Sequence, residues 1–183
     1  MQEYLTNKFI KQMTHYYINC NRGMEDISIQ EILKTIPDAE VETFLHFPAR
    51  LLVKTKEKAQ KLLQLKSIYD LIEIKKLFVL NPPHQASLDK IIKDTPIDEM
   101  KNVATFRVTS SRYGKHEFNS VDMQRIIGSE LGTRYGTKVD LENYAINIRC
   151  DLLGTRGFIG IQHNKKSLSK RQQRSFNHSA GLK

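Results

Sequence analysis

Apolar positions in the first half of the chain change repeatedly between the spacing of a strand and that of a helix. Four short apolar runs predict strands, and they span 16–19, 41–45, 51–55 and 72–80. Two segments between them predict helices, 24–36 and 57–65. In the first helix, the apolar residues Ile29, Ile32, Leu33 and Ile36 share one face. The order strand, helix, strand, strand, helix, strand is the split βαβ arrangement of a ferredoxin-like domain, which we expect over 14–82 after an N-terminal extension of residues 1–13.

The second half begins after the double proline at 82–83 and combines strands with longer helices. Ser87 is expected to cap a helix that carries Leu88 and Ile92. Alternation over 104–110 predicts a strand with one wet face. Asn119 and Ser120 are good N-caps for a helix over 121–131, which Gly132 is placed to end.

The alternation of apolar and polar residues is clearest over 144–152, where every second residue is apolar. The intervening Asn147, Arg149 and Asp151 are therefore predicted to face outward. A turn at 154–157 leads into 158–162 and completes an antiparallel hairpin. The fold class predicted is α+β (mixed α/β), with a ferredoxin-like N-terminal domain and a second domain of mixed sheet and helices over 83–163. The polar, basic stretch from His163 onward is interpreted as a linker, assigned to 164–183.

Composition excludes several classes of protein. The 183 residues are 39% hydrophobic and 27% charged, which is typical of a soluble globular chain. No apolar run approaches the roughly 20 residues that span a bilayer, and the N-terminus lacks the core of a signal peptide. The two cysteines, Cys20 and Cys150, suit a reducing compartment. We therefore expect a cytoplasmic protein without a membrane partner.

The net charge of +9 is confined to one half of the chain. Residues 1–100 hold 14 basic and 14 acidic residues, whereas 101–183 hold 15 basic and 6 acidic residues. A neutral half joined to a basic half indicates a scaffold with a surface for a polyanion, and nucleic acid is the leading candidate. The alternative is a solvated basic face with Tyr113 packed down.

Motifs for catalysis are not found. The sequence has no GxxxxGK[ST] or GxGxxG loop, and its six histidines are scattered without metal-ligand spacing. Asn81-Pro82-Pro83-His84 resembles the NPPY-type motif of amino methyltransferases, but His84 stands at the aromatic position. A double proline that stiffens the link between two halves is the favoured explanation. We predict no catalytic, metal or cofactor site in this chain.

Three segments of the second half together resemble a THUMP domain. They are FRVTSSRYGKHEFNS (106–120), QRIIGSEL (124–131) and VDLENYAINIRCDLLGTRGFIGIQ (139–162). They are most similar to the THUMP region of RNA guanine-N2 methyltransferases that modify tRNA, which have relatives acting on 23S rRNA. CNRGMEDISIQEI (20–32) is similar to the start of the ferredoxin-like domain that precedes THUMP in these enzymes, and SLSKRQQR (167–174) to the basic segment before their catalytic domain.

The resemblance implies that the chain binds structured RNA, by gripping the single-stranded 3′ end and acceptor stem of tRNA. It also implies S-adenosylmethionine as the methyl donor of the parent enzyme, in a catalytic domain that we expect to be missing from this chain. The chain alone is then an RNA-binding module and not an enzyme. Alternatives are a free-standing adaptor that delivers tRNA to a separate enzyme, and an rRNA substrate. The residues predicted to contact RNA are Arg107, Ser111, Arg112, Tyr113, Lys115, Arg125, Arg149, Lys170 and Arg171.

Overall fold

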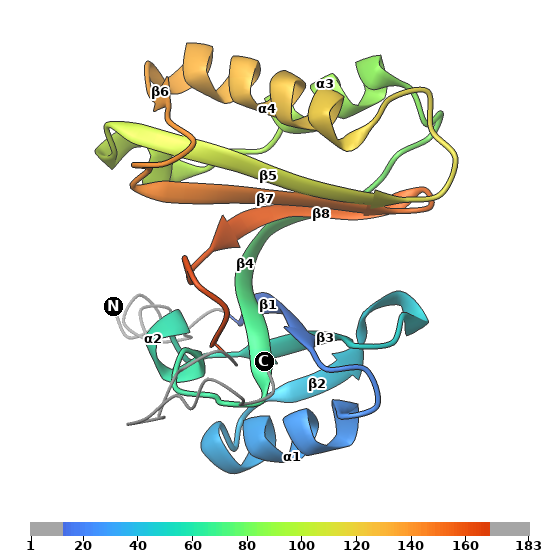
Figure 1. Ribbon diagram of the computed structural model, residues 1–183, viewed down its shortest axis with the longest axis vertical. Coiled ribbons are helices and arrows are strands. Elements are labelled where there is room, and N and C mark those ends of the chain that lie inside the picture. The colour runs from blue at the N-terminus through green and yellow to red at the C-terminus, as the bar shows by residue number, and fades with distance from the viewer. Residues whose placement is uncertain (1–12, 169–183) are drawn as a thin grey trace, which may run out of the picture.

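A computed structural model describes residues 13–168 of the protein. Eight strands form one sheet in the order β2-β3-β1-β4-β8-β7-β5-β6, with helices on two opposite sides of the molecule (Figure 1). The mixed α/β class predicted from the sequence is confirmed. No helix within this described part of the chain is long and apolar enough to cross a membrane.

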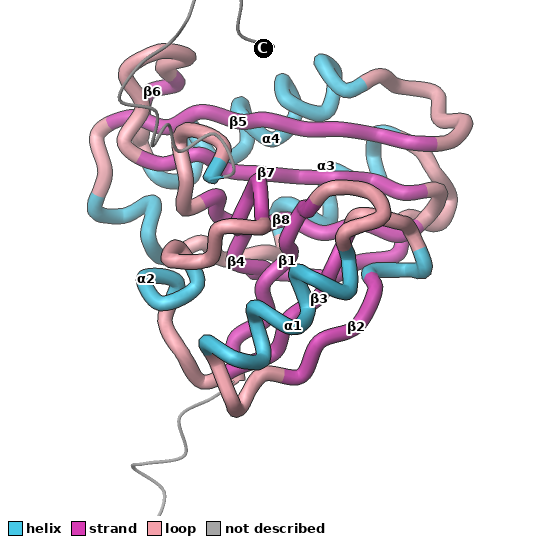
Figure 2. Tube along the Cα trace, turned by 60° about the horizontal axis from the view of Figure 1, so that its bottom comes forward, coloured by secondary structure: helices cyan, strands magenta, loops and turns pink. Residues whose placement is uncertain are grey.

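The first half has the predicted order of elements. They are β1 (Thr14–Cys20), α1 (Glu25–Thr35), β2 (Glu40–Thr43), β3 (Arg50–Thr55), α2 (Ala59–Leu62) and β4 (Ile68–Val79). The four strands are antiparallel in the order β2-β3-β1-β4, the pattern of a ferredoxin-like domain. Helix α1 lies across the sheet of this half (Figure 2), where Ile32 and Ile36 pack in a core with Ile18, Leu51 and Val53.

The second half adds two longer helices and four strands. They are α3 (Gln85–Lys93), β5 (Thr105–Tyr113), α4 (Ser120–Tyr135), β6 (Lys138–Val139), β7 (Ile146–Leu153) and β8 (Arg156–Gln162). Strand β5 runs parallel to β6 and β7, whereas β7 and β8 form the predicted antiparallel hairpin. Helices α3 and α4 cover one face of these strands, above them in Figure 1. Their apolar sides build a second core that includes Phe106, Ile127 and Ile148.

Strand β4 connects the two halves within the sheet. Its first residues pair with β1, and its residues from Ile72 to Val79 pair with β8. Close pairing depends on Gly160, because a Cβ there would lie 2.2 Å from the carbonyl oxygen of Glu73. A third apolar cluster fills the space between the halves, where Tyr17 and Phe44 meet Phe158 with ring centroids 4.4 to 5.7 Å apart. The two halves therefore have separate cores but share a strand and an aromatic contact.

Helix α4 begins as predicted and ends later than predicted. Asn119 is its N-cap and forms a capping box with Asp122. The expected stop at Gly132 is wrong, because the helix continues to Tyr135 and ends at Gly136 in the left-handed conformation with φ 65°. A Cβ at Gly132 would lie 3.4 Å from the carbonyl oxygen of Thr137. This glycine therefore permits close packing inside the helix.

Smaller differences concern elements of marginal length. Ser87 lies inside α3, which follows His84 without a side-chain cap. Helix α2 has a single turn instead of the nine residues expected. Leu33 is exposed, and Leu45 lies beyond the end of β2 in a short 3-10 turn, Phe44–His46 (η2).

The predicted outward face of β7 is also wrong. Asn147 and Asp151 are buried, because the first half of the chain covers this face of the sheet. The interpretation of the stretch from His163 as a linker is wrong for its first residues. The Asn164 side chain is buried and accepts a hydrogen bond from the Leu71 backbone at 2.8 Å, and Leu168 packs in the core of the first half.

Candidate nucleic-acid interface

The turn that follows β5 is held firmly against the β7–β8 hairpin. Gly114 has φ 113° and approaches Gly154 so closely that a Cβ would lie 3.3 Å from its Cα. His116 Nε2 donates to the Gly154 carbonyl at 2.7 Å, and Arg112 Nη1 donates to the Gly114 carbonyl at 2.9 Å. The turn therefore presents its side chains from a fixed backbone.

Tyr113 is the last residue of β5 and is 65% exposed. Its ring is therefore not packed down on the protein, as the alternative of a merely solvated basic face had assumed. Its ring meets Phe47, which belongs to the loop between β2 and β3, edge-on with centroids 5.7 Å apart. The Arg50 guanidinium lies 5.1 Å from the centroid of the same Phe47 ring. The contact brings an aromatic and a basic residue of the neutral half to the basic turn.

We call this set of residues the composite edge: Phe47, Arg50, Arg112, Tyr113 and Lys115. Within residues 13–168, none of its three cations forms an ion pair with a carboxylate, and Lys115 has no polar contact at all. Cations without a carboxylate partner beside an exposed aromatic ring, here that of Tyr113, are suited to binding the phosphates and bases of single-stranded nucleic acid.

Arg107 marks a second basic position on β5. Its guanidinium lies 5.6 Å from the centroid of the Tyr144 ring, and Lys165 Nζ lies 4.9 Å from the same centroid. Tyr113 lies six positions further along the strand, roughly 20 Å away at about 3.3 Å per residue. Ser111 lies between them, half-buried, with its backbone N–H donating to Asp151 at 3.0 Å.

Arg149 does not face solvent as predicted. It donates to both carboxylate oxygens of Asp151, at 2.7 and 3.1 Å, and its side chain is 23% exposed. Burial alone would lower the pKa of this guanidinium, but the adjacent Asp151 more than offsets burial and the pKa is raised. The charge of Arg149 is therefore paired within the strand instead of being presented to solvent.

The remaining predicted residues are not brought together with the edge. Arg125 projects from α4, on the helical side of the sheet, with its side chain 78% exposed and only a 4.0 Å approach to Asp122. Lys170 and Arg171 lie outside the described residues.

Sequence reasoning missed Phe47 and Arg50, because the neutral half of the chain was taken as scaffold. A signal was present in the run HFPAR (46–50), which places an aromatic and a basic residue around a proline. The loop is also strained, since Leu45, His46 and Ala49 have positive φ values of 52°, 59° and 64°. Such strain in residues other than glycine often accompanies functional positions.

Residues 13–168 contain no group of three potential metal ligands. Cys150 is fully buried, and burial raises the pKa of its thiol. His84 directly precedes α3, and its Nδ1 lies 2.6 Å from Glu117.

Residues 85–162 match the THUMP domain. The match covers somewhat less than half of the chain, and the half that precedes it has the strand order of a ferredoxin-like domain. The resemblance inferred from the sequence is thereby confirmed.

The individual relatives are enzymes of tRNA modification. The chain is 27% identical over 150 residues to the tRNA (guanine(6)-N2)-methyltransferase of Thermus thermophilus, covering 81% of this chain and 44% of the relative. It is 29% identical over 111 residues to the tRNA sulfurtransferase of Desulfurococcus amylolyticus, covering 61% and 22%. The crystal structure of TrmN from Thermus thermophilus has a TM-score of 0.76 at 26% identity, over 86% of this chain and 48% of that chain. The chain therefore spans less than half the length of each of these proteins.

Proposed function

We propose that this chain is the tRNA-binding part of a tRNA guanine-N2 methyltransferase. The composite edge is the observation that carries the proposal, because the exposed Tyr113 of one half contacts Phe47 of the other, with Arg50 against the Phe47 ring and two further cations in the turn that follows Tyr113. The two relatives are named for different reactions, methyl transfer and sulfur transfer, but both names specify tRNA. The shared region is thus better explained by the shared substrate than by either reaction.

The methyltransferase is favoured over the sulfurtransferase by coverage. The similarity to the former extends over 81% of this chain and that to the latter over 61%. S-adenosylmethionine would then be the methyl donor of the parent protein. Within residues 13–168, each turn from a strand to a helix holds at most one glycine, so these residues do not fit a site for that donor.

The part of tRNA that suits the composite edge is the unpaired 3′ end with the adjoining acceptor stem. An exposed tyrosine stacks on an unpaired base, a contact of about 1–3 kcal/mol. Arg112 and Lys115 are three residues apart around Gly114, so both reach one stretch of phosphates. Bases in a duplex would not be free to stack on Tyr113.

A charge reversal tests the proposal. Arg112→Glu and Lys115→Glu should each weaken tRNA binding by about tenfold or more, through loss of a phosphate contact and added repulsion. Lys115→Glu is the cleaner change, because Arg112 also holds the turn. The matched control is Lys56→Glu, an exposed lysine just beyond the end of β3 remote from Arg50. Binding is measured by fluorescence anisotropy at several salt concentrations, and equal affinities of all three variants would refute the proposal.

A further inference from the structure

Strand β5 has an open edge along most of its length. Within the described sheet, its neighbour on this side, β6, pairs with only the first two residues of β5 (Figure 1). The Phe106 carbonyl accepts the N–H of Asp140 on this side at 2.9 Å. Because backbone groups alternate in direction along a strand, Ser110 and Arg112 also direct their N–H and carbonyl groups to this side. These groups form no backbone hydrogen bond with residues 13–168, so they could pair with another strand.

An apolar groove of about 310 Å³ lies between this edge and α4. Its floor includes Val108 and Gly128, which are both buried, and a Cβ on Gly128 would lie 3.9 Å from Val108 Cγ2. Its sides include Val121, Val139 and Leu141, which are 50%, 44% and 65% exposed. We call this hollow the β5 groove. It gathers three exposed apolar side chains, which residues 13–168 leave without a cover.

Cations lie on both sides of the open edge. Arg125 is the charged residue of the groove lining, and its nearest approach to a carboxylate is the 4.0 Å to Asp122. On the other face of β5, Arg107 lies against the Tyr144 ring and forms no ion pair with a carboxylate of residues 13–168. Asp140, just beyond β6, accepts two backbone N–H groups of the turn that follows it. The charge around the edge therefore suits an acidic partner.

The backbone edge, the apolar groove and the cations together favour one kind of occupant. Unpaired N–H and carbonyl groups recognise another polypeptide strand, whose side chains alternate between the groove and the opposite face. A second copy of this chain would bring like charges together, because each chain has a net charge of +9. The chain's own stretch SKRQQR (169–174) is basic as well. RNA phosphates would find Arg125 but no partner among the apolar walls.

We propose that the open edge of β5 binds an extended acidic segment of a partner protein. The segment adds a strand to the sheet beyond β6, with apolar side chains in the β5 groove and acidic side chains between them. The stretch from Val108 to Arg112 offers room for about five residues of such a strand. The lining of the β5 groove shares no residue with the composite edge, so this docking site does not depend on the proposed function.

Hydrogen exchange of the full chain with a defined peptide tests the proposal. The probe is a heptapeptide in which glutamate and valine alternate, and its binding is measured by fluorescence anisotropy. In NMR, the peptide should slow exchange of the Ser110 and Arg112 amides by about tenfold or more. The amide of Thr109, which faces β7, should change little. A peptide with lysine in place of glutamate should bind about tenfold more weakly.

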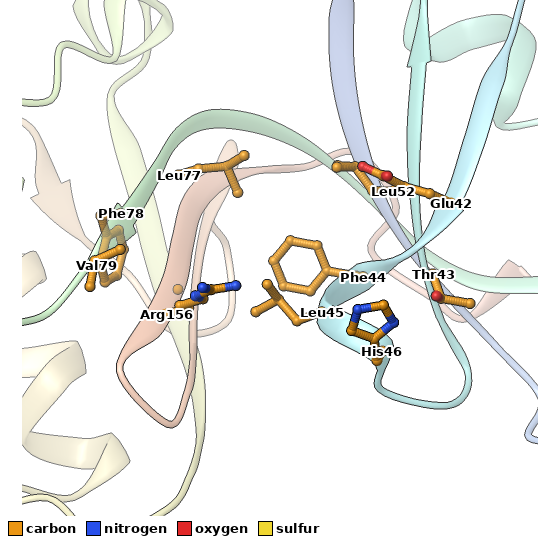
Figure 3. A pocket seen from close by; sticks show the side chains of 11 residues that line it. Glu42, Thr43, Phe44, Leu45, His46, Leu52, Leu77, Phe78, Val79 and Arg156 are labelled. Atoms are coloured by element: carbon orange, nitrogen blue, oxygen red, sulfur yellow. The ribbon is translucent and has the colours of Figure 1, made fainter.

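A second hollow supplies the control, a cavity of about 510 Å³ between the two halves of the molecule. It lies between the strained turn after β2, with Leu45, and the end of β4, with Leu77 (Figure 3). The charged side chains of its lining, Glu42 and Arg156, have opposite signs, so charge does not favour an occupant there. Leu77 is 47% exposed and is therefore a leucine comparable to Leu141 outside the β5 groove.

Three variants locate the binding. Leu141→Ser and Arg125→Glu should each weaken peptide binding by about fivefold or more, through loss of an apolar contact and through added repulsion. Leu77→Ser should bind the peptide as the wild-type chain does. Leu141→Ser should keep the affinity of the wild-type chain for tRNA, so failure of this proposal is distinguishable from failure of the proposed function.

Several results would overturn the docking site. They are absence of peptide binding, equal losses in Leu141→Ser and Leu77→Ser, and binding that leaves the Ser110 and Arg112 amides unprotected. Protection of these two amides by a heptauridine RNA would indicate RNA as the occupant instead. Protection that appears without peptide as the protein concentration rises would indicate a second copy of this chain.

Discussion

Tyr113 and Phe47 come from different halves of the chain. Tyr113 was predicted from the sequence to contact RNA, whereas Phe47 was not. Their edge-on contact leaves most of the Tyr113 ring in solvent. An exposed aromatic ring costs free energy in water, and the ring adds little to the cores of either half. The exposed face of the ring is therefore open to contact with a ligand.

Substitution of Tyr113 separates the two explanations. Tyr113→Ala should weaken binding of an RNA with an unpaired 3′ end by about tenfold, because one stacking surface is removed. The free energy of unfolding should change by no more than about 0.5 kcal/mol, as for other exposed positions. Tyr113→Phe keeps the ring and should bind almost as the wild-type chain does. Titrations by anisotropy, with urea denaturation in parallel, would contradict the account if the alanine variant bound normally.

Asp151 is predicted to matter for stability. It accepts hydrogen bonds from Arg149 and from the backbone of Ser111, and it is 3% exposed. Asp151→Ala would leave a half-buried guanidinium and a buried N–H without their acceptor, and should lower the free energy of unfolding by about 3 kcal/mol. Urea denaturation measures the loss. A change below about 1 kcal/mol would show that the pair does not hold the strand face.

At the scale of elements, the pairing of β4 with β8 depends on a single glycine. A Cβ at Gly160 would lie 2.2 Å from the Glu73 carbonyl oxygen and 2.9 Å from Ile72 Cγ2, so Gly160→Ala must push the strands apart. We expect a loss of about 2–3 kcal/mol in the free energy of unfolding. The control is Gly128→Ala in α4, where the new methyl group would meet its neighbours at 3.8 and 3.9 Å and should be tolerated. Equal stability of the two variants in thermal denaturation would contradict this role of Gly160.

Strand β4 also carries a carboxylate that makes the fold sensitive to acid. His163 Nε2 lies 3.1 Å from Glu73 and Lys75 Nζ 2.6 Å, and these contacts lower the Glu73 pKa to about 2 despite partial burial. Because the folded pKa lies below the unfolded value of 4.5, the stabilisation is complete above pH 4.5 and is lost as the pH falls toward 2. Its magnitude is roughly 3 kcal/mol.

Denaturation at two pH values tests this linkage. The difference in the free energy of unfolding between the wild-type chain and Glu73→Gln should be large at pH 7 and should shrink markedly at pH 2.5. Glu142→Gln, at an exposed position, should show no such difference. A difference for Glu73→Gln that is constant with pH would mean that the contacts with His163 and Lys75 do not stabilise the fold.

Periodic segments were predictable from the sequence because their packing is local. The six elements of the first half and the capping box at Asn119 follow from apolar spacing and cap chemistry. The orientation of Arg149 was not predictable, since alternation identifies two faces of a strand but does not say that another part of the chain covers the second one. The contact of Phe47 with Tyr113 and the cavity were not predictable for the same reason, because both form only where the two halves meet.

At the scale of the whole molecule, the candidate interface depends on how the halves are held together. Asp70 at the centre of the junction accepts hydrogen bonds from Asn19, Gln162 and Asn164, at 3.0 to 3.3 Å. The aromatic cluster of Tyr17, Phe44 and Phe158 packs on the same side. The composite edge and the cavity are therefore products of a fixed arrangement, which places Tyr113 of one half against Phe47 in the strained loop of the other.

Comparison of intact tRNA with tRNA that lacks its unpaired 3′ nucleotides tests the central claim most directly. With the full chain, intact tRNA should bind with a steep dependence on salt, each neutralised phosphate adding about −0.7 to −0.9 to the slope of log K against log salt. Removal of the 3′ nucleotides should weaken binding by tenfold or more, because it takes away the unpaired bases that we propose stack on Tyr113. Changes in the anticodon arm should have little effect. Equal affinity for intact and trimmed tRNA would contradict the account.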